Sequence, residues 1–157
     1  MARTDKETIL LAEDRPDDVD LLRFAFKKAG IKNPLMVVDN GQKAIDYICG
    51  HGAYSDRGKY PLPELILLDL RMPEVDGYEF MAWLRSQPQV QKIPVVAVAD
   101  FTAISDKTKA RQAGAWACVP KPVNLETFTE SIAQMIAAWR LGARFWQPTE
   151  QSRAHLQ

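Results

Sequence analysis

An aspartate at the end of an apolar run is the first candidate for chemistry in this sequence. Residues 65–68 are apolar without alternation and lead directly into Asp69. Such a short run is typical of a strand buried on both faces of a parallel sheet. A carboxylate at its carboxyl end lies in the crevice where open α/β sheets bind ligands. Taken alone, an aspartate in this place more often caps the next turn than does chemistry, and Pro73 and Gly77 do require a loop here.

Other polar side chains follow strands that would end at the same edge. Glu13 and Asp14 follow the apolar run 8–12, and Lys121 follows the run 115–119. Clustered carboxylates repel one another, and Mg²⁺, which prefers oxygen ligands, relieves that repulsion. A carboxylate beside such a cation can attack phosphorus and form an acyl phosphate, while a lysine neutralises the phosphoryl oxygens. Taken singly, the two acids could cap a helix and the lysine could be a solvated surface residue.

The elements that must position these residues alternate along the chain. Apolar runs at 8–12, 35–38, 65–69, 93–99 and 115–119 predict five strands, and amphipathic segments between and after them predict five helices. This alternation predicts an α/β fold with a five-stranded parallel sheet covered on both faces. In the last helix the apolar stripe that starts at Leu125 continues through Trp139, Leu141, Phe145 and Trp146 to position 148. We therefore expect one domain over residues 1–148 and a polar tail over 149–157.

Composition excludes several classes of protein. The formal net charge of the 157 residues is zero, so no strong attraction to nucleic acid or to an anionic membrane is expected. No signal peptide or membrane-spanning run is visible, which favours a cytoplasmic protein. Two buried thiols, Cys49 and Cys118, are a better prediction for such a chain than a disulfide. His51 and His155 lack metal-ligand spacing, so a zinc site is not expected.

The motifs 9–14, 67–77 and 121–122 resemble, in order and spacing, the signatures of the receiver domain of two-component response regulators, the CheY-like superfamily. The resemblance covers roughly residues 7–140. It implies a doubly wound, flavodoxin-like fold and a phosphoryl group accepted on Asp69 from a histidine kinase. It implies that Asp14, Asp69 and the backbone carbonyl of Arg71 hold Mg²⁺, and that Glu13 acts through metal-bound water. Lys121 would pair with Asp69 or with its phosphoryl group, and the bond that follows Lys121 can be cis or trans because Pro122 comes next.

A narrower resemblance points to single-domain regulators paired with bacterial and cyanobacterial phytochromes. It rests on the long loop at 50–63, on Asn124-Leu125-Glu126 after the lysine and on the aromatic C-terminal extension. It implies a phytochrome-type histidine kinase as partner. Because relatives of this kind often form homodimers through the last helix, it also predicts a homodimer. No DNA-binding segment follows, so we expect output by protein contact, without nucleic acid or membrane. The candidate dimer residues are Trp139, Leu141, Phe145 and Trp146.

Two positions depart from the receiver pattern. The end of the fourth strand, where the family carries Thr or Ser, holds Ala99, followed by Asp100, and the usual aromatic position of the fifth strand holds Cys118. Alanine has no donor for a phosphoryl oxygen, so phosphorylation of Asp69 would be weakly coupled to shape change. A different register, with Thr102 or Ser105 supplying the hydroxyl, is the alternative.

Other functions stay open at this point. A constitutive dimeric adaptor or a phosphate sink would also fit the missing hydroxyl. An aspartate-nucleophile phosphatase needs a second Asp where Arg71 stands, so that enzyme class is disfavoured. A flavin-binding module is disfavoured because the loop at 13–18 is rich in carboxylates, which repel phosphate.

Overall fold

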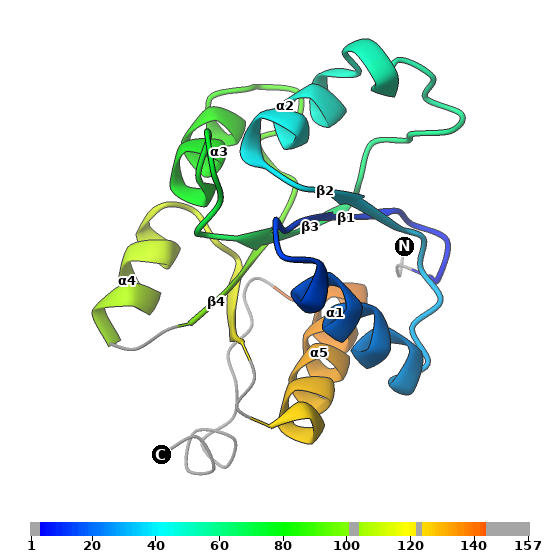
Figure 1. Ribbon diagram of the computed structural model, residues 1–157, viewed down its shortest axis with the longest axis vertical. Helices are drawn as coiled ribbons and strands as arrows, with labels where there is room; N and C mark the ends of the chain where they lie inside the picture. The colour runs from blue at the N-terminus through cyan, green and yellow to red at the C-terminus, as the bar shows by residue number, and fades with distance from the viewer. Residues whose placement is uncertain (1–3, 101–103, 122–123, 144–157) are drawn as a thin grey trace.

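The structure is a computed structural model that describes residues 4–100, 104–121 and 124–143. It contains a parallel sheet in the order β2-β1-β3-β4-β5 (Figure 1). The strands are β1 Ile9–Ala12, β2 Leu35–Val38, β3 Leu65–Asp69, β4 Val95–Ala99 and β5 Ala117–Pro120. Every residue of β1, β3 and β4 is buried, as an unbroken apolar run predicts. The predicted five-stranded parallel sheet is confirmed.

Helices cover both faces of this sheet. They are α1 Pro16–Lys28, α2 Gly41–Cys49, α3 Gly77–Arg85, α4 Ile104–Gln112 and α5 Leu125–Arg140. One core cluster joins the sheet to α2, α3 and α4, and a second joins the opposite face to α1 and α5. Figure 1 shows α1 and α5 side by side on one side of the sheet, with α2 and α3 on the other. The arrangement is the predicted doubly wound, flavodoxin-like fold.

Helix starts are fixed close to the carboxyl edge of the sheet. α1 begins at Pro16, whose fixed φ suits a first helical position, and Asp17 and Asp18 lie in its first turn. α3 begins with a capping box in which the Asp76 side chain accepts from the Glu79 N–H at 2.9 Å and Glu79 accepts from the Asp76 N–H. The helices that follow β1 and β3 are therefore held in place directly beside the strand ends.

The loop between β3 and α3 is packed too closely for side chains at two glycines. A Cβ on Gly77 would lie 2.7 Å from Leu70 Cα, and a Cβ on Gly41 would collide with the Val75 carbonyl. Within the same loop, Glu74 adopts a left-handed conformation with φ 65°. Close approach at Gly41 and Gly77 therefore fixes the path of the chain that leaves Asp69.

The segment 50–63 forms an ordered insertion after α2, with a short 3₁₀ helix η1 at Gly52–Tyr54. Arg57 donates to the carbonyls of Tyr47 at 2.8 Å and Ile48 at 2.6 Å, which belong to the last turn of α2. The rings of Tyr54 and Tyr60 pack against Tyr47 at centroid distances of 5.2 and 6.0 Å. The insertion is thus attached to the end of α2 by the Arg57 guanidinium and by aromatic packing.

Several expectations about the ends and the thiols differ from the structure. α5 ends at Arg140, before position 148, because Gly142 takes a left-handed φ of 74° and the Ala143 N–H returns to the Ala138 carbonyl at 3.1 Å. Residues 144–157, with the predicted polar tail, lie outside the described residues, as does Pro122 and hence its cis or trans bond. Cys118 is buried as predicted, but the prediction for Cys49 is wrong, since it is exposed; both are free thiols. No helix among the described residues is long and apolar enough to cross a membrane.

Replacement of Gly41 by Ala should destabilise the protein by about 1 to 3 kcal/mol, because the added methyl group must displace Val75 and the loop after β3. The control is Gly58→Ala, where the nearest atom is the flexible Asp56 carboxylate at 3.2 Å. Urea unfolding followed by circular dichroism measures both variants. Equal stability of the two would show that the loop adjusts without cost.

Candidate functional site

Three carboxylates meet at the carboxyl edge of the two central strands. Ala12 of β1 pairs with Leu68 of β3, so the next residues, Glu13 and Asp69, are neighbours across the sheet. Carboxylate oxygens of Glu13, Asp14 and Asp69 all lie within 4.8 Å of one another. Glu13 and Asp69 are buried, and Asp14 is half-buried. The structure therefore brings together the three acids that the sequence placed at this edge.

Lys121 reaches this cluster from the end of β5. Its backbone N–H donates to the Ala99 carbonyl at 2.9 Å, which continues the pairing of β5 with β4. Its Nζ lies 3.5 Å from Asp69 Oδ2 and 3.2 Å from Glu13 Oε2. The lysine is therefore part of the carboxylate cluster, and its solvated surface alternative is excluded.

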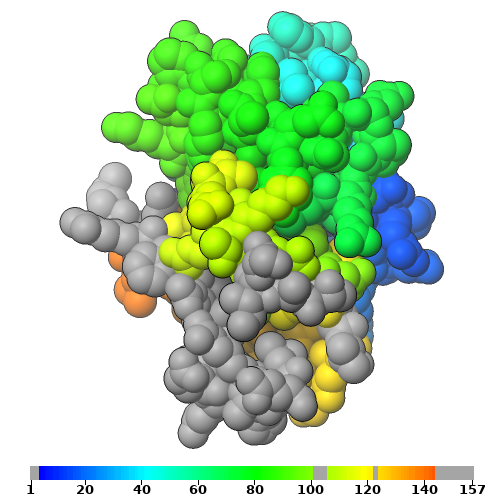
Figure 2. Space-filling view, turned by 90° about the vertical axis from the view of Figure 1, so that its left-hand side faces the viewer, coloured from blue at the N-terminus to red at the C-terminus, as the bar shows by residue number. Residues whose placement is uncertain are grey.

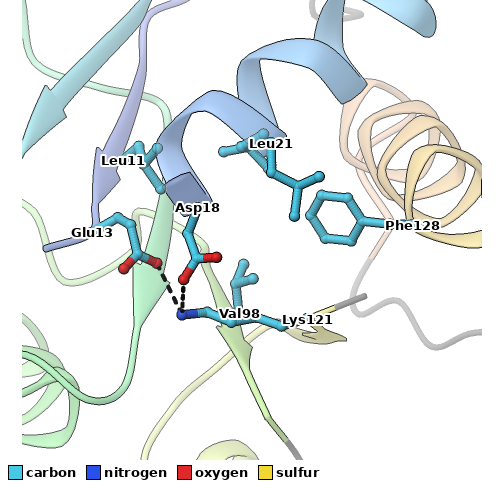
Figure 3. Close-up of a pocket in the computed structure, with 8 residues that line it drawn as sticks. Leu11, Glu13, Asp18, Leu21, Val98, Lys121 and Phe128 are labelled. Atoms are coloured by element: carbon cyan, nitrogen blue, oxygen red, sulfur yellow. Dashed lines mark hydrogen bonds and ion pairs between the residues drawn. The ribbon is translucent and has the colours of Figure 1, made fainter. Parts of the chain in front are cut away.

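Asp18 is a member of the site that the sequence analysis missed. Its Oδ2 accepts a hydrogen bond from Lys121 Nζ at 2.8 Å (Figure 3). In the sequence, Asp18 is one of two acids in a first helical turn, where a carboxylate is already explained by the helix dipole. Its position in the sequence could have identified it. Only three residues separate the end of β1 from the start of α1, so the first turn of α1 lies at the same edge of the sheet as the end of β1.

The charges in this cluster alter one another's pKa. Burial, and then the Asp69 charge, raise the pKa of Glu13 to about 7. Burial also raises the pKa of Asp69. The Arg71 N–H, which donates to Asp69 Oδ1 at 3.1 Å, and the Lys121 charge act in the opposite direction, but burial outweighs them. For Lys121, burial favours the neutral amine, but the hydrogen bond to Asp18 and the nearby carboxylate charges raise its pKa above the ordinary value. The Lys121 ammonium therefore neutralises the negative charge of the carboxylate cluster only in part.

The donor set fits a hard divalent cation. Asp14 Oδ1 is buried and finds no hydrogen-bond partner among the described residues. A buried carboxylate oxygen without a partner is costly, and a Mg²⁺ ion sharing oxygens with Glu13, Asp14 and Asp69 would remove that cost. Arg71, whose backbone carbonyl is the remaining predicted ligand, has its N–H on Asp69 Oδ1, so its backbone lies beside the cluster.

The two unusual positions lie where the sequence predicted them. Ala99 is the last residue of β4 and is buried, whereas Asp100 after it is exposed. Cys118 of β5 is buried against the cluster that includes α3 and α4. Tyr78 of α3 packs on the same cluster, and Lys109 of α4 lies over its ring at 4.5 Å.

The alternative hydroxyl donors are Thr102 and the Ser105 side chain, and both lie outside the described residues. Figure 2 shows α4, in yellow-green, at the surface next to the green atoms of the α3 region.

The four candidate dimer residues do not share one environment. Trp139 is 1% exposed and belongs to the core between α5 and the sheet, so within the described chain it is an internal residue. Leu141 is 85% exposed. Phe145 and Trp146 lie outside the described residues.

Comparison with known proteins agrees with this geometry. Residues 9–133 match the response regulator receiver domain. The chain belongs to this family. Receiver domains bind Mg²⁺ or Mn²⁺ at an acidic pocket, and Glu13, Asp14 and Asp69 form an acidic cluster here.

Individual relatives are similar in sequence or in structure. The chain is 30% identical over 126 residues to the polar-differentiation response regulator DivK of Brucella anthropi, which covers 80% of this chain and 93% of DivK. The response regulator RPA3017 in red light signaling of R. palustris superposes with a TM-score of 0.81 at 34% identity, over 85% of this chain and 93% of that one.

Two further structures superpose with TM-scores of 0.74 at 28% identity. They are the Mn²⁺-bound form of response regulator Rcp1, over 85% of this chain and 94% of that one, and the phosphorylated cyanobacterial phytochrome response regulator RcpA, over 87% and 94%. The chain is thus structurally similar to phytochrome response regulators.

The receiver's stability should depend on the protonation of Glu13. Because its pKa rises from 4.5 to about 7 on folding, the folded state binds the extra proton, and the free energy of unfolding falls as pH rises between these values. In metal-free buffer, Glu13→Gln should therefore be more stable than the original protein at pH 8, by an amount on the order of 2 kcal/mol, and the difference should vanish towards pH 4.5. Thermal melting across this range measures it.

The control is Glu64→Gln, at an exposed glutamate. A Glu13→Gln protein that melts below the original one at pH 8 would contradict the direction of this pKa shift.

Proposed function

We propose that this receiver domain accepts a phosphoryl group on Asp69 from a histidine kinase and signals through protein contact. One observation carries the proposal. A buried carboxylate at the end of β3 has two further carboxylates with oxygens within 4.8 Å and the Lys121 ammonium 3.5 Å from its Oδ2. This is the arrangement that phosphoryl transfer to a carboxylate needs: a positioned nucleophile with positive charge available for the phosphoryl oxygens.

Each residue has a separate task in the transfer. An Asp69 oxygen attacks phosphorus while the phosphorus–nitrogen bond of the donor histidine breaks and its electron pair remains on the imidazole nitrogen. The Arg71 N–H, donating at 3.1 Å, orients the Asp69 carboxylate through Oδ1. Lys121 donates to phosphoryl oxygens as negative charge gathers on them. Asp14, Asp69 and the Arg71 carbonyl would hold Mg²⁺, with Glu13 acting through water, and the ion would supply further positive charge to the same oxygens.

A phytochrome-type photoreceptor kinase is the partner that the neighbours favour. RPA3017 belongs to red light signaling, and RcpA is a phytochrome response regulator whose phosphorylated form has been solved. The ordered insertion at 50–63, held by Arg57 on the end of α2, is the part of the described surface that the narrower resemblance singled out.

Homodimerisation and a cytoplasmic location belong to the same proposal. The exposed Leu141 is the dimer candidate that the described surface offers.

Phosphorylation of Asp69 is tested by intact-protein mass after incubation with Mg²⁺ and either a small phosphodonor or a phosphorylated histidine kinase. We expect one added phosphoryl group on the original protein and none on Asp69→Asn, because an amide cannot form the acyl phosphate. The matched control, Asp100→Asn, removes an exposed carboxylate from the same sheet edge and should be phosphorylated like the original protein. No addition with either donor, on a folded protein, would favour a constitutive adaptor instead.

The coupling of phosphorylation to α4 should be weak and should increase in Ala99→Thr. A hydroxyl at this buried strand end adds a hydrogen bond to a charged acceptor, which separates the two states by roughly 1.5 to 3 kcal/mol more than alanine does. Hydrogen exchange across residues 104–112, with and without phosphodonor, measures the change. Ala99→Val has the same branched shape without the hydroxyl and is the control. Equal responses of the two variants would show that the missing hydroxyl does not limit coupling.

A further inference from the structure

The carboxylate nearest to Lys121 is not the proposed phosphoacceptor. Nζ lies 2.8 Å from Asp18 Oδ2, 3.2 Å from Glu13 Oε2 and 3.5 Å from Asp69 Oδ2. Figure 3 shows the amino group of Lys121 directed towards Asp18 at the start of α1 and towards Glu13. The ammonium therefore forms its shortest contact with Asp18 of α1, while it remains within ion-pair distance of Glu13 and Asp69.

We propose that Asp18 is a positioning residue that draws the Lys121 ammonium towards α1, limits its pairing with Asp69 and so keeps the Asp69 carboxylate available to Mg²⁺ and to the incoming phosphoryl group. This inference rests on the proposed function of Asp69. Asp18 lies outside the group of three carboxylates that can share a metal ion, so it can take up the ammonium without occupying a metal ligand.

The argument is one of competition between cations. An ammonium that closes on Asp69 and Glu13 neutralises the carboxylates that a divalent cation would bind and repels that cation. Lys121 is 14% exposed and Asp18 is 22% exposed, so solvent screens their attraction less than it would on an open surface. Arg15 is a further cation near Asp18, and its Nε lies 3.8 Å away on a side chain 68% exposed, which makes it a weak competitor for Asp18.

The position of Asp18 is fixed by the helix that carries it. Its N–H donates to the Arg15 carbonyl at 3.0 Å in the first turn of α1. The apolar side chains of Leu21, Leu22 and Phe128 line the same pocket as Asp18 and Lys121, as Figure 3 shows for Leu21 and Phe128. Low polarity on this side strengthens the ion pair and limits where the ammonium can lie.

Magnesium affinity measured by calorimetry tests the proposal directly. In Asp18→Asn, Lys121 loses its charged partner on α1 and can close on Asp69, so we expect Mg²⁺ to bind about threefold to tenfold more weakly than to the original protein. The matched control is Asp17→Asn, which removes the same charge from an exposed position in the same turn and should change affinity less than about twofold. Asp18→Glu retains a carboxylate and should recover most of the affinity.

A second background separates positioning from simple charge loss. In Lys121→Met no ammonium is present, so Asp18→Asn should weaken Mg²⁺ binding no more than Asp17→Asn does. Asp18→Ser is a second variant that removes the carboxylate, since serine is also accepted in a first turn, and it should give the same results as Asp18→Asn. An Asp18→Asn effect that equals the Asp17→Asn effect in the original background, or that persists undiminished in Lys121→Met, would overturn the proposal.

The rate of phosphoryl addition provides an independent readout. Asp18→Asn should be phosphorylated more slowly than the original protein at limiting Mg²⁺ and at a similar rate at saturating Mg²⁺, because only metal binding is impaired. A rate that stays low at saturating Mg²⁺ would contradict positioning. If the original protein is not phosphorylated at any Mg²⁺ concentration, the proposed function fails, whereas the calorimetric comparison still decides the role of Asp18.

Discussion

The carboxyl edge of this sheet depends on the ion pairs of the half-buried Lys121 ammonium. Glu13 and Asp69 are buried with Asp14 beside them, and like charges in a region of low polarity repel strongly. Burial, and then the Asp69 charge that the ammonium offsets only in part, raise the pKa of Glu13 to about 7. One oxygen of Asp14 has no hydrogen-bond partner among the described residues. A site of this kind is unstable by itself and favours added positive charge, which is a requirement for binding a metal ion and a phosphoryl group.

The strand order and the loop packing make this cluster obligatory. Because β1 and β3 are neighbours in the sheet, Glu13 and Asp69 cannot separate without loss of backbone pairing. The loop after Asp69 has little freedom either, since Gly77 lies against Leu70 and the capping box at Asp76 begins α3 immediately. The stability of the sheet therefore offsets the repulsion between the crowded carboxylates. The long side chain of Lys121 remains adjustable.

Most of the fold and part of the site could be predicted from the sequence. Unbroken apolar runs identify buried strands, and parallel strands bring their carboxyl ends together, so Asp69 and Lys121 could be placed without coordinates. Asp18 could not, because a first-turn carboxylate has the same signature whether it serves the helix dipole or a lysine from β5. The end of α5 was also hidden, since its apolar period continues past Gly142, whose left-handed conformation and not hydrophobicity ends the helix.

The effect of the hydroxyl that Ala99 lacks depends on how firmly α4 is packed. Among the α4 side chains that the structure describes, Ala110 is the buried one, and the Lys109 ammonium lies over the Tyr78 ring of α3 at 4.5 Å. The described side chains of α4 therefore bury little apolar surface, and low apolar burial lowers the free energy needed to move a segment. Ala99 reduces the free energy with which a phosphoryl group can distinguish two positions of α4, but a helix whose described side chains bury little apolar surface also needs less free energy to move. α4 therefore responds to phosphorylation when the free energy lost at Ala99 is no larger than the reduction in the free energy needed to move the helix.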